Sequence, residues 1–101
     1  MAILAIFTGK GMTRAMYEGL RPEVNWERNH PQGALLHACG FDDKGDLHVA
    51  DVWESAESMM QFVNSRLAPA MQKLKIPQPA VEVYPLSNMN VYPAADPHRL
   101  K

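Results

Sequence analysis

The 101-residue sequence has a single cysteine, almost no net charge and no long hydrophobic run. Cys39 cannot form an intramolecular disulfide, so a reducing, cytoplasmic setting is the default expectation. Ten Lys and Arg residues against eleven Asp and Glu residues give a net charge of −1, without the basic excess typical of nucleic-acid binders. No apolar stretch approaches the ~20 residues of a membrane-spanning helix. The N-terminus is apolar from the start and lacks the basic segment that opens a secretory signal.

Signatures of cofactor chemistry are absent as well. The four histidines are not spaced as metal ligands. Gly9 and Gly11 do not have the spacing of a phosphate-binding loop, and no serine lies in a nucleophile elbow. We therefore expect no metal, haem or flavin as a required cofactor.

Hydrophobic residues make up 47% of the chain, which is ordinary for one globular domain. Short apolar runs predict four strands, and two segments with apolar residues at helical spacing predict helices between them. Thr13 and Ser55 are placed to cap these helices. Pro22 is expected to break or kink the first helix near Leu20. Pro69 interrupts the second stretch, so we expect one helix ending near Ser65 and a further turn or short helix starting around Pro69. The strands are expected at residues 2–8, 34–41, 47–53 and 80–86.

The predicted order of elements is β-α-β-β-α-β, which is the split β-α-β, or ferredoxin-like, pattern of an α+β fold. In this pattern the first and third strands are central in a four-stranded antiparallel sheet, and both helices lie on one face. The fourth strand contains Pro85 and is expected at an edge. We expect this domain to cover residues 1–88 and residues 89–101 to form a C-terminal tail.

Both faces of the predicted sheet are apolar, although two helices can cover only one of them. The first strand places Ile3, Ala5 and Phe7 on one face and Leu4 and Ile6 on the other. Because large exposed apolar patches are poorly tolerated, a second copy of the chain is the simplest cover, through a two-fold interface between sheets. We therefore expect a homodimer, with neither nucleic acid nor membrane as a partner.

The clearest hairpin joins the second and third strands through residues 43–45. A three-residue loop with its glycine in the left-handed region places His37 opposite Asp51 and Leu35 opposite Trp53. A two-residue loop would shift this pairing by one and turn Asp51 to the other face. The face with His37 and Asp51 is expected to lie between the two subunits. The opposite face has small apolar side chains and is expected to pack against the helices.

His37 and Asp51 form the most informative chemical pair. A carboxylate beside an imidazole fixes its tautomer, as a general base requires. Alternatively, the two groups merely satisfy each other inside the core. Tryptophans can stack on a flat substrate or simply fill space, and a tyrosine at helical spacing or an asparagine after a strand can have a purely structural role. The candidate catalytic residues are His37 and Asp51, and the candidate substrate-binding residues are Trp53, Tyr17, Trp26 and Asn88.

Four short segments carry a family resemblance: residues 33–38 (GALLHA), 43–45 (DKG), 51–55 (DVWES) and 66–69 (RLAP). Together with the order of elements, they resemble the dimeric α/β-barrel superfamily over residues 2–88. Within it, the chain is most similar to the small proteins grouped with the antibiotic-biosynthesis monooxygenases. The superfamily also contains haem-degrading enzymes, cyclases and members without known activity, so the resemblance implies fold and dimer more than reaction.

The resemblance suggests an enzyme that acts on an aromatic or polyketide-like molecule. In a cofactor-independent monooxygenase, the substrate would be deprotonated by His37, and its carbanion would react directly with O₂. A non-catalytic small-molecule binder or accessory protein is the alternative, with His37 and Asp51 only orienting a ligand. Haem binding through His37 is a third possibility, which an Asp directly opposite disfavours.

Overall fold

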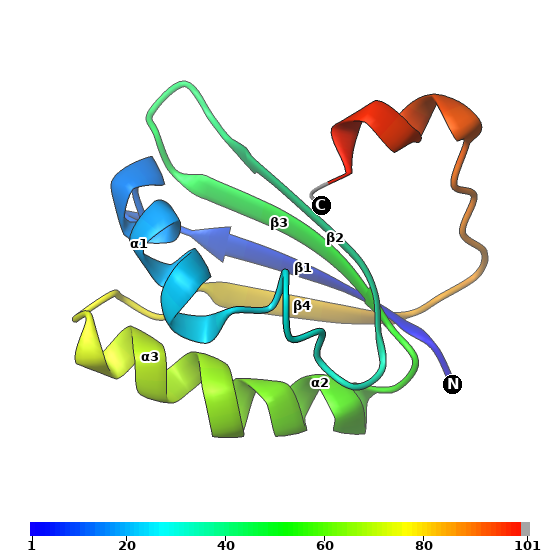
Figure 1. Ribbon diagram of the computed structural model, residues 1–101, viewed down its shortest axis with the longest axis horizontal. Coiled ribbons are helices and arrows are strands. Elements are labelled where there is room, and N and C mark those ends of the chain that lie inside the picture. The colour runs from blue at the N-terminus through cyan, green and yellow to red at the C-terminus, as the bar shows by residue number, and fades with distance from the viewer. Residues whose placement is uncertain (100–101) are drawn as a thin grey trace.

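Four antiparallel strands and two helical segments make up the computed structural model, which describes residues 1–99 (Figure 1). The strands lie in the order β2-β3-β1-β4, with β1 and β3 central. The predicted ferredoxin-like α+β fold is confirmed, including β4 at an edge. The elements in chain order are β1 (Ile3–Gly9), α1 (Arg14–Val24), β2 (Ala34–Phe41), β3 (Leu47–Trp53), α2 (Ala56–Phe62), a π-helical segment (Val63–Leu67), α3 (Ala68–Lys73) and β4 (Ala80–Pro85).

Helix α1 begins and ends at residues that cap it. The Thr13 hydroxyl accepts a hydrogen bond from the Met16 backbone N–H at 3.3 Å, as the sequence predicts, and Asn25 closes the helix with φ 64°. Pro22 does not break the helix, which continues to Val24, so of the break or kink expected near Leu20 the break is wrong. Pro22 lies on the exposed side of the helix, where water can hydrogen-bond the carbonyl that a proline leaves without a donor.

The second helical segment has no break at Pro69, but a separate short helix, α3, begins at Ala68, as expected around this proline. Ser55 caps α2 as expected, since its hydroxyl accepts from the Ser58 N–H at 3.0 Å. A π-helical turn then leads directly into α3, and the Ala68 N–H donates to the Val63 carbonyl. Pro69 falls in the first turn of α3, where a missing N–H is tolerated. The wider turn shifts the hydrogen-bond register there and so accommodates the proline.

The β2–β3 hairpin has the predicted register. The Asp42 N–H donates to the Asp46 carbonyl at 3.0 Å, and the Gly45 N–H donates to the Asp42 carbonyl at 2.9 Å. Gly45 has φ 83°, the left-handed conformation that the three-residue loop requires. His37 therefore lies opposite Asp51, and the alternative register is excluded.

The start of β2 departs from the predicted pairing. Ala34, and not Leu35, lies opposite Trp53, because the register shifts between Ala34 and Leu36. Leu35 is the extra residue of this irregularity, and it is exposed. A bulge of this kind changes which side chains of a strand share a face, so the predicted contact between Leu35 and Trp53 is wrong.

The predicted assignment of the two sheet faces is reversed in the structure. His37 and Asp51 share the helix-facing side with large buried residues such as Phe7 and Trp53. The small side chains that were expected to pack on the helices lie on the other face. The reason is volume: the space between a helix layer and a sheet is filled to high density, which requires large side chains. The buried core includes Ile3, Ala5, Phe7, Tyr17, Leu20, Val24, Leu47, Val49, Trp53, Met59, Ala70 and Met71.

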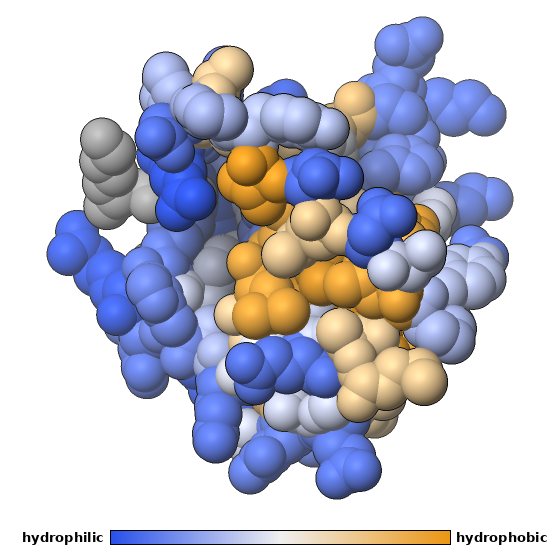
Figure 2. Space-filling view, turned by 90° about the vertical axis from the view of Figure 1, so that its right-hand side faces the viewer, coloured by the Kyte–Doolittle hydropathy of each residue, from blue (hydrophilic) through white to orange (hydrophobic). Residues whose placement is uncertain are grey.

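The face of the sheet away from the helices is also apolar at its centre. Leu36, Val52 and Leu4 form one row across β2, β3 and β1, and Ile6 continues the apolar surface beside them. Leu4 and Ile6 remain partly exposed. Figure 2 shows an apolar area framed by hydrophilic residues on the side of the molecule that is at the right in Figure 1.

After β4 the chain leads away from the sheet and forms a 3₁₀ helix at Pro93–His98 (Figure 1). Residues 100 and 101, which belong to the predicted tail, lie outside the described residues. Within residues 1–99, no helix has both the length and the apolar character needed to cross a bilayer.

Candidate functional site

His37 is held between strand β3 and helix α1 by hydrogen bonds at both ring nitrogens. Its Nδ1 lies 2.7 Å from Oδ1 of Asp51, and its Nε2 lies 2.7 Å from the Tyr17 hydroxyl. A carboxylate only accepts, so Nδ1 carries the proton, and Nε2 of the neutral imidazole accepts from the Tyr17 O–H. Asp51, His37 and Tyr17 thus form one continuous hydrogen-bonded chain.

Asp51 is the only charged residue in the buried core of residues 1–99, with 8% of its surface exposed. Its second oxygen, Oδ2, accepts a hydrogen bond from the Trp53 indole N–H at 3.2 Å. Both carboxylate oxygens therefore have donors, as a buried charge requires. The Trp53 ring packs against Phe62 of α2 with centroids 5.4 Å apart, so Trp53 is a core residue that orients Asp51.

Aromatic side chains surround the outer part of this chain. The Trp26 ring lies against both Tyr17 and His37, with centroid distances of 5.7 and 5.4 Å. Phe41 meets the Tyr17 ring edge-on at 6.0 Å, and the Arg14 guanidinium lies 4.6 Å from the Phe41 centroid. The His37 side chain remains 33% exposed. The imidazole is therefore reachable from solvent at the edge strand β2, within an aromatic setting suited to flat ligands.

The Trp26 indole N–H is buried and has no hydrogen-bond partner within residues 1–99. An unsatisfied buried donor is costly and uncommon in native proteins. The Trp26 ring contacts both Tyr17 and His37. The site therefore contains the His37 imidazole, which can accept a proton, and the indole N–H of Trp26, which has no acceptor within residues 1–99.

Burial keeps the two other titratable groups of the site in their neutral forms. It raises the pKa of the Tyr17 phenol well above its usual value. It also raises the pKa of the Cys39 thiol, which lies on the helix-facing side of β2 next to His37. A thiol nucleophile needs a lowered pKa, so Cys39 is not set up for nucleophilic chemistry.

The structure brings together five of the six residues that the sequence singles out. Asn88 is the exception: it follows β4, at the edge of the sheet opposite β2, and is exposed. Phe41 and Arg14 border the site but were not predicted. Phe41 shares strand parity with His37 and Cys39, and this two-residue period is the signal that could have identified it. The residues that meet are His37, Asp51, Trp53, Tyr17 and Trp26.

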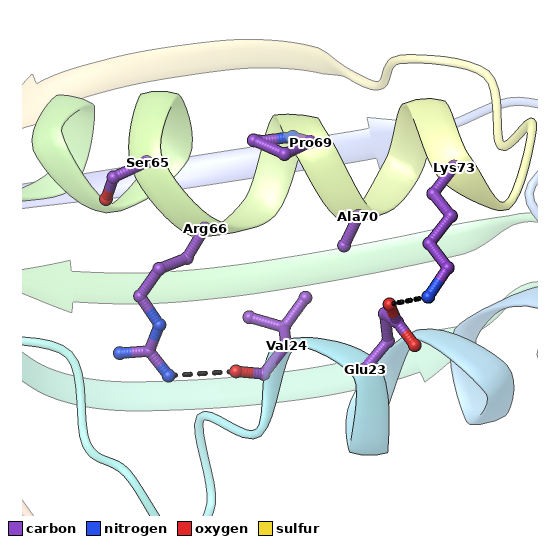
Figure 3. A pocket seen from close by; sticks show the side chains of 7 residues that line it. All are labelled: Glu23, Val24, Ser65, Arg66, Pro69, Ala70 and Lys73. Carbon is purple, nitrogen blue, oxygen red and sulfur yellow. Dashed lines mark hydrogen bonds and ion pairs between the residues drawn. The ribbon is translucent and has the colours of Figure 1, made fainter.

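Two grooves on the surface lie elsewhere. The larger of the two, of about 320 Å³, runs between the end of α1 on one side and the π-helical segment and α3 on the other (Figure 3). Its charged groups are already paired: Lys73 Nζ lies 2.6 Å from Glu23 Oε1, and Arg66 donates to the carbonyls of Val24 and Asn29 at 2.9 and 2.8 Å. These contacts tie α1 and its following loop to α3, which is a structural role. The second groove, of about 250 Å³, is lined by Glu18, Arg21, Pro22, Asn25, Glu27 and Arg28.

Metal ligands are not gathered anywhere in the part of the chain that the structure describes. No three His, Cys, Asp or Glu side chains of residues 1–99 are placed to hold an ion together. The hydrogen-bonded chain of Asp51, His37 and Tyr17 is an arrangement along which a proton can be transferred.

Solved structures of other proteins share this fold. A protein of unknown function from Nitrosomonas europaea is 17% identical, with a TM-score of 0.65 over 91% of this chain and 96% of that one. A candidate antibiotic biosynthesis monooxygenase from Caulobacter crescentus CB15 is 12% identical, with a TM-score of 0.65 over 86% and 91%. A variant of SnoaB, a cofactor-independent oxygenase from Streptomyces nogalater, is 12% identical, with a TM-score of 0.59 over 87% and 93%.

At these identities the similarity establishes the fold alone. The predicted resemblance to antibiotic-biosynthesis-monooxygenase-like proteins is confirmed at that level. No protein-family model matches the chain, and no curated protein matches it.

Proposed function

We propose that the protein is a small-molecule enzyme of the cofactor-independent monooxygenase type. His37 accepts a proton from an aromatic or polyketide-like substrate, and the resulting carbanion reacts with O₂ without flavin or metal. Asp51 holds the imidazole in the tautomer that leaves Nε2 as the acceptor. The observation that carries the proposal is the 2.7 Å contact between His37 Nδ1 and the buried Asp51 carboxylate.

The surroundings of the pair support a ligand of this kind. Trp26, Tyr17 and Phe41 line the accessible side of the imidazole with aromatic rings. The structural relatives include a cofactor-independent oxygenase, which is consistent with this chemistry.

Oxygen uptake with a panel of phenols and quinols tests the proposal. Wild-type protein is expected to consume O₂ with at least one member, and His37→Gln to lose ~10²–10⁴-fold of that rate, the usual contribution of a general base. His48→Gln is the matched control, because His48 is an exposed histidine on the neighbouring strand, paired with Asp42. Equal losses in the two variants, or full activity in His37→Gln, would contradict a role for His37 as base.

A small-molecule-binding or accessory protein is the second candidate. One observation favours it: both nitrogens of His37 already have hydrogen-bond partners within the chain. Calorimetry with the same phenols and quinols separates the two functions, because a binder would take up a ligand without consuming O₂.

A homodimer is part of the proposal. Leu4, Ile6, Leu36 and Val52 give the sheet face away from the helices an apolar centre. A second copy would cover it with an identical surface across a two-fold axis. The exposed apolar residues of the C-terminal segment, Met89, Val91 and Tyr92, are available to extend the same contact.

A further inference from the structure

His37 cannot accept a substrate proton directly while its present contacts last. Nδ1 is bonded to Asp51, and Nε2 is bonded to the Tyr17 hydroxyl. The only route to Nε2 that leaves both hydrogen bonds in place passes through the Tyr17 oxygen. A phenol hydroxyl both donates and accepts, so this oxygen can receive one proton while it gives up another.

We propose that Tyr17 is a catalytic residue that takes the substrate's proton and passes its own proton to His37. The inference rests on the proposed function only in that His37 is the final proton acceptor. A substrate hydroxyl, R–OH, donates to Tyr17 Oη, and the Tyr17 proton moves to His37 Nε2. The products are R–O⁻, a neutral Tyr17 and an imidazolium whose Nδ1–H still donates its hydrogen bond to Asp51. The substrate O–H bond and the original Tyr17 O–H bond break, a new O–H bond forms on Tyr17 and an N–H bond forms on His37, and no oxidant is needed for this step.

Packing favours this relay over displacement of Tyr17 by the substrate. Tyr17 is buried, its ring contacts both Trp26 and Phe41, and it is part of the hydrophobic core. Moving it away would expose core surface and leave Nε2 without its donor. Burial also raises the pKa of Tyr17, which favours the neutral phenol before and after the transfer.

The spare donor of Trp26 defines the substrate class more narrowly. Its indole N–H is buried without a partner within residues 1–99, and its ring contacts both Tyr17 and His37. A ligand with an acidic hydroxyl next to an acceptor oxygen would satisfy both groups once the Trp26 ring turns its buried N–H toward the bound ligand. Its hydroxyl would donate to Tyr17, and the neighbouring oxygen would accept from Trp26. Enols of β-dicarbonyl compounds and ring hydroxyls beside a quinone carbonyl have this arrangement.

Nitrophenols provide a direct test, because their ionisation changes their visible absorption. In 2-nitrophenol the hydroxyl stands beside nitro oxygens, whereas in 4-nitrophenol it does not. Wild-type protein is expected to raise the ionised fraction of both probes above the value in free solution at the same pH, and to bind 2-nitrophenol about tenfold tighter than 4-nitrophenol, the ratio that one net hydrogen bond provides. Trp26→Phe is expected to remove this preference.

Tyr17→Phe is the decisive variant, because it keeps the ring and leaves His37 and Asp51 in place. We expect probes bound to Tyr17→Phe to be no more ionised than in solution, and we expect the same of His37→Gln. Tyr92→Phe alters an exposed tyrosine and is expected to ionise the probes as wild type does. If Tyr17→Phe ionises the probes as wild type does, or if wild type does not ionise them at all, the relay is overturned. If wild type ionises the probes but consumes no O₂ with any phenol or quinol, the relay stands and the oxygenase proposal fails.

A measurement on wild-type protein covers the case in which Tyr17→Phe does not fold. Nitrogen NMR of the imidazole is expected to show neutral His37 protonated at Nδ1 without probe, and imidazolium when the bound probe is ionised. A neutral His37 beside an ionised probe would overturn the relay.

Discussion

The Tyr17 hydroxyl lies 2.7 Å from Nε2 of His37, and the two rings are nearly parallel, with 10° between their planes. This contact joins α1 to the edge strand β2, where the rings of Trp26 and Phe41 lie close to the pair formed by His37 and the buried Asp51 carboxylate. The position of α1 therefore affects the proton-accepting nitrogen of His37, because a shift of the helix would move the Tyr17 hydroxyl away from Nε2.

Trp53→Phe isolates the hydrogen bond that supports Asp51. The substitution keeps an aromatic ring against Phe62 but removes the N–H that binds Asp51 Oδ2. Hydrogen bonds to charged groups contribute about 1.5–3 kcal/mol, so we expect a loss of that size in the free energy of unfolding, measured with urea. Trp26→Phe is the control, because its N–H has no partner within residues 1–99. Equal losses in the two variants would show that the Trp53–Asp51 bond contributes nothing.

Gly33→Ala is expected to destabilise the loop that leads into β2. Gly33 has φ 86°, and an added Cβ would lie 2.6 Å from the Ser58 Cβ at the start of α2. Left-handed backbone strain in a non-glycine residue costs about 1–3 kcal/mol, and the clash adds to it, so the melting temperature should fall by several degrees. Gly19→Ala is the matched control: it lies in α1 with open space at its Cβ position, and alanine should stabilise that helix by about 0.5–1 kcal/mol. A Gly33→Ala variant as stable as wild type would contradict the strained conformation.

Local turn chemistry made the pairing of His37 with Asp51 predictable. Gly45 and its neighbours specify one loop type, and the loop length fixes the register. The face that His37 occupies was not predictable in the same way, because β1 is apolar on both sides and its alternation does not say which side the helices cover. The bulge shifted the pairing at the start of β2, and its extra residue is a leucine, which does not distinguish a bulge from a regular strand position.

The contact between Tyr17 and His37 depends on tertiary placement. Tyr17 falls on the apolar stripe of α1, and such a position predicts a core residue. That prediction is correct for its ring. Only the crossing of α1 over β2 brings its hydroxyl to the imidazole, and sequence spacing carries no information on that crossing. The direct connection of α2 to α3 was missed for a related reason, since the π-helical turn between them depends on packing as well as on residue type.

Alkaline conditions should destabilise the fold through Tyr17. Burial raises the pKa of Tyr17 in the folded protein, whereas an unfolded tyrosine titrates near about pH 10. The unfolded state therefore loses its proton first, and stability is fully present below that pH and declines as the pH rises further. We expect urea unfolding at about pH 11 to show a smaller loss for Tyr17→Phe, relative to its own value at about pH 8, than for wild type or for Tyr92→Phe. Identical losses in all three proteins would mean that Tyr17 is not protected from ionisation by the fold.

Ile6→Lys tests the proposed two-fold contact between sheets. Ile6 lies on the face away from the helices, between Ala50 on β3 and Glu82 on β4. In a monomer, the lysine would reach water and the Glu82 carboxylate, so the fold should persist. In a dimer, the same ammonium would be buried against an identical surface, which costs several kcal/mol. We expect light scattering at micromolar concentration to give about twice 11.3 kDa for wild type and the monomer mass for Ile6→Lys. Met60→Lys, at an exposed position on α2, should remain dimeric. A wild-type monomer would refute the sheet-to-sheet model, and a dimeric Ile6→Lys protein would place the interface on another surface.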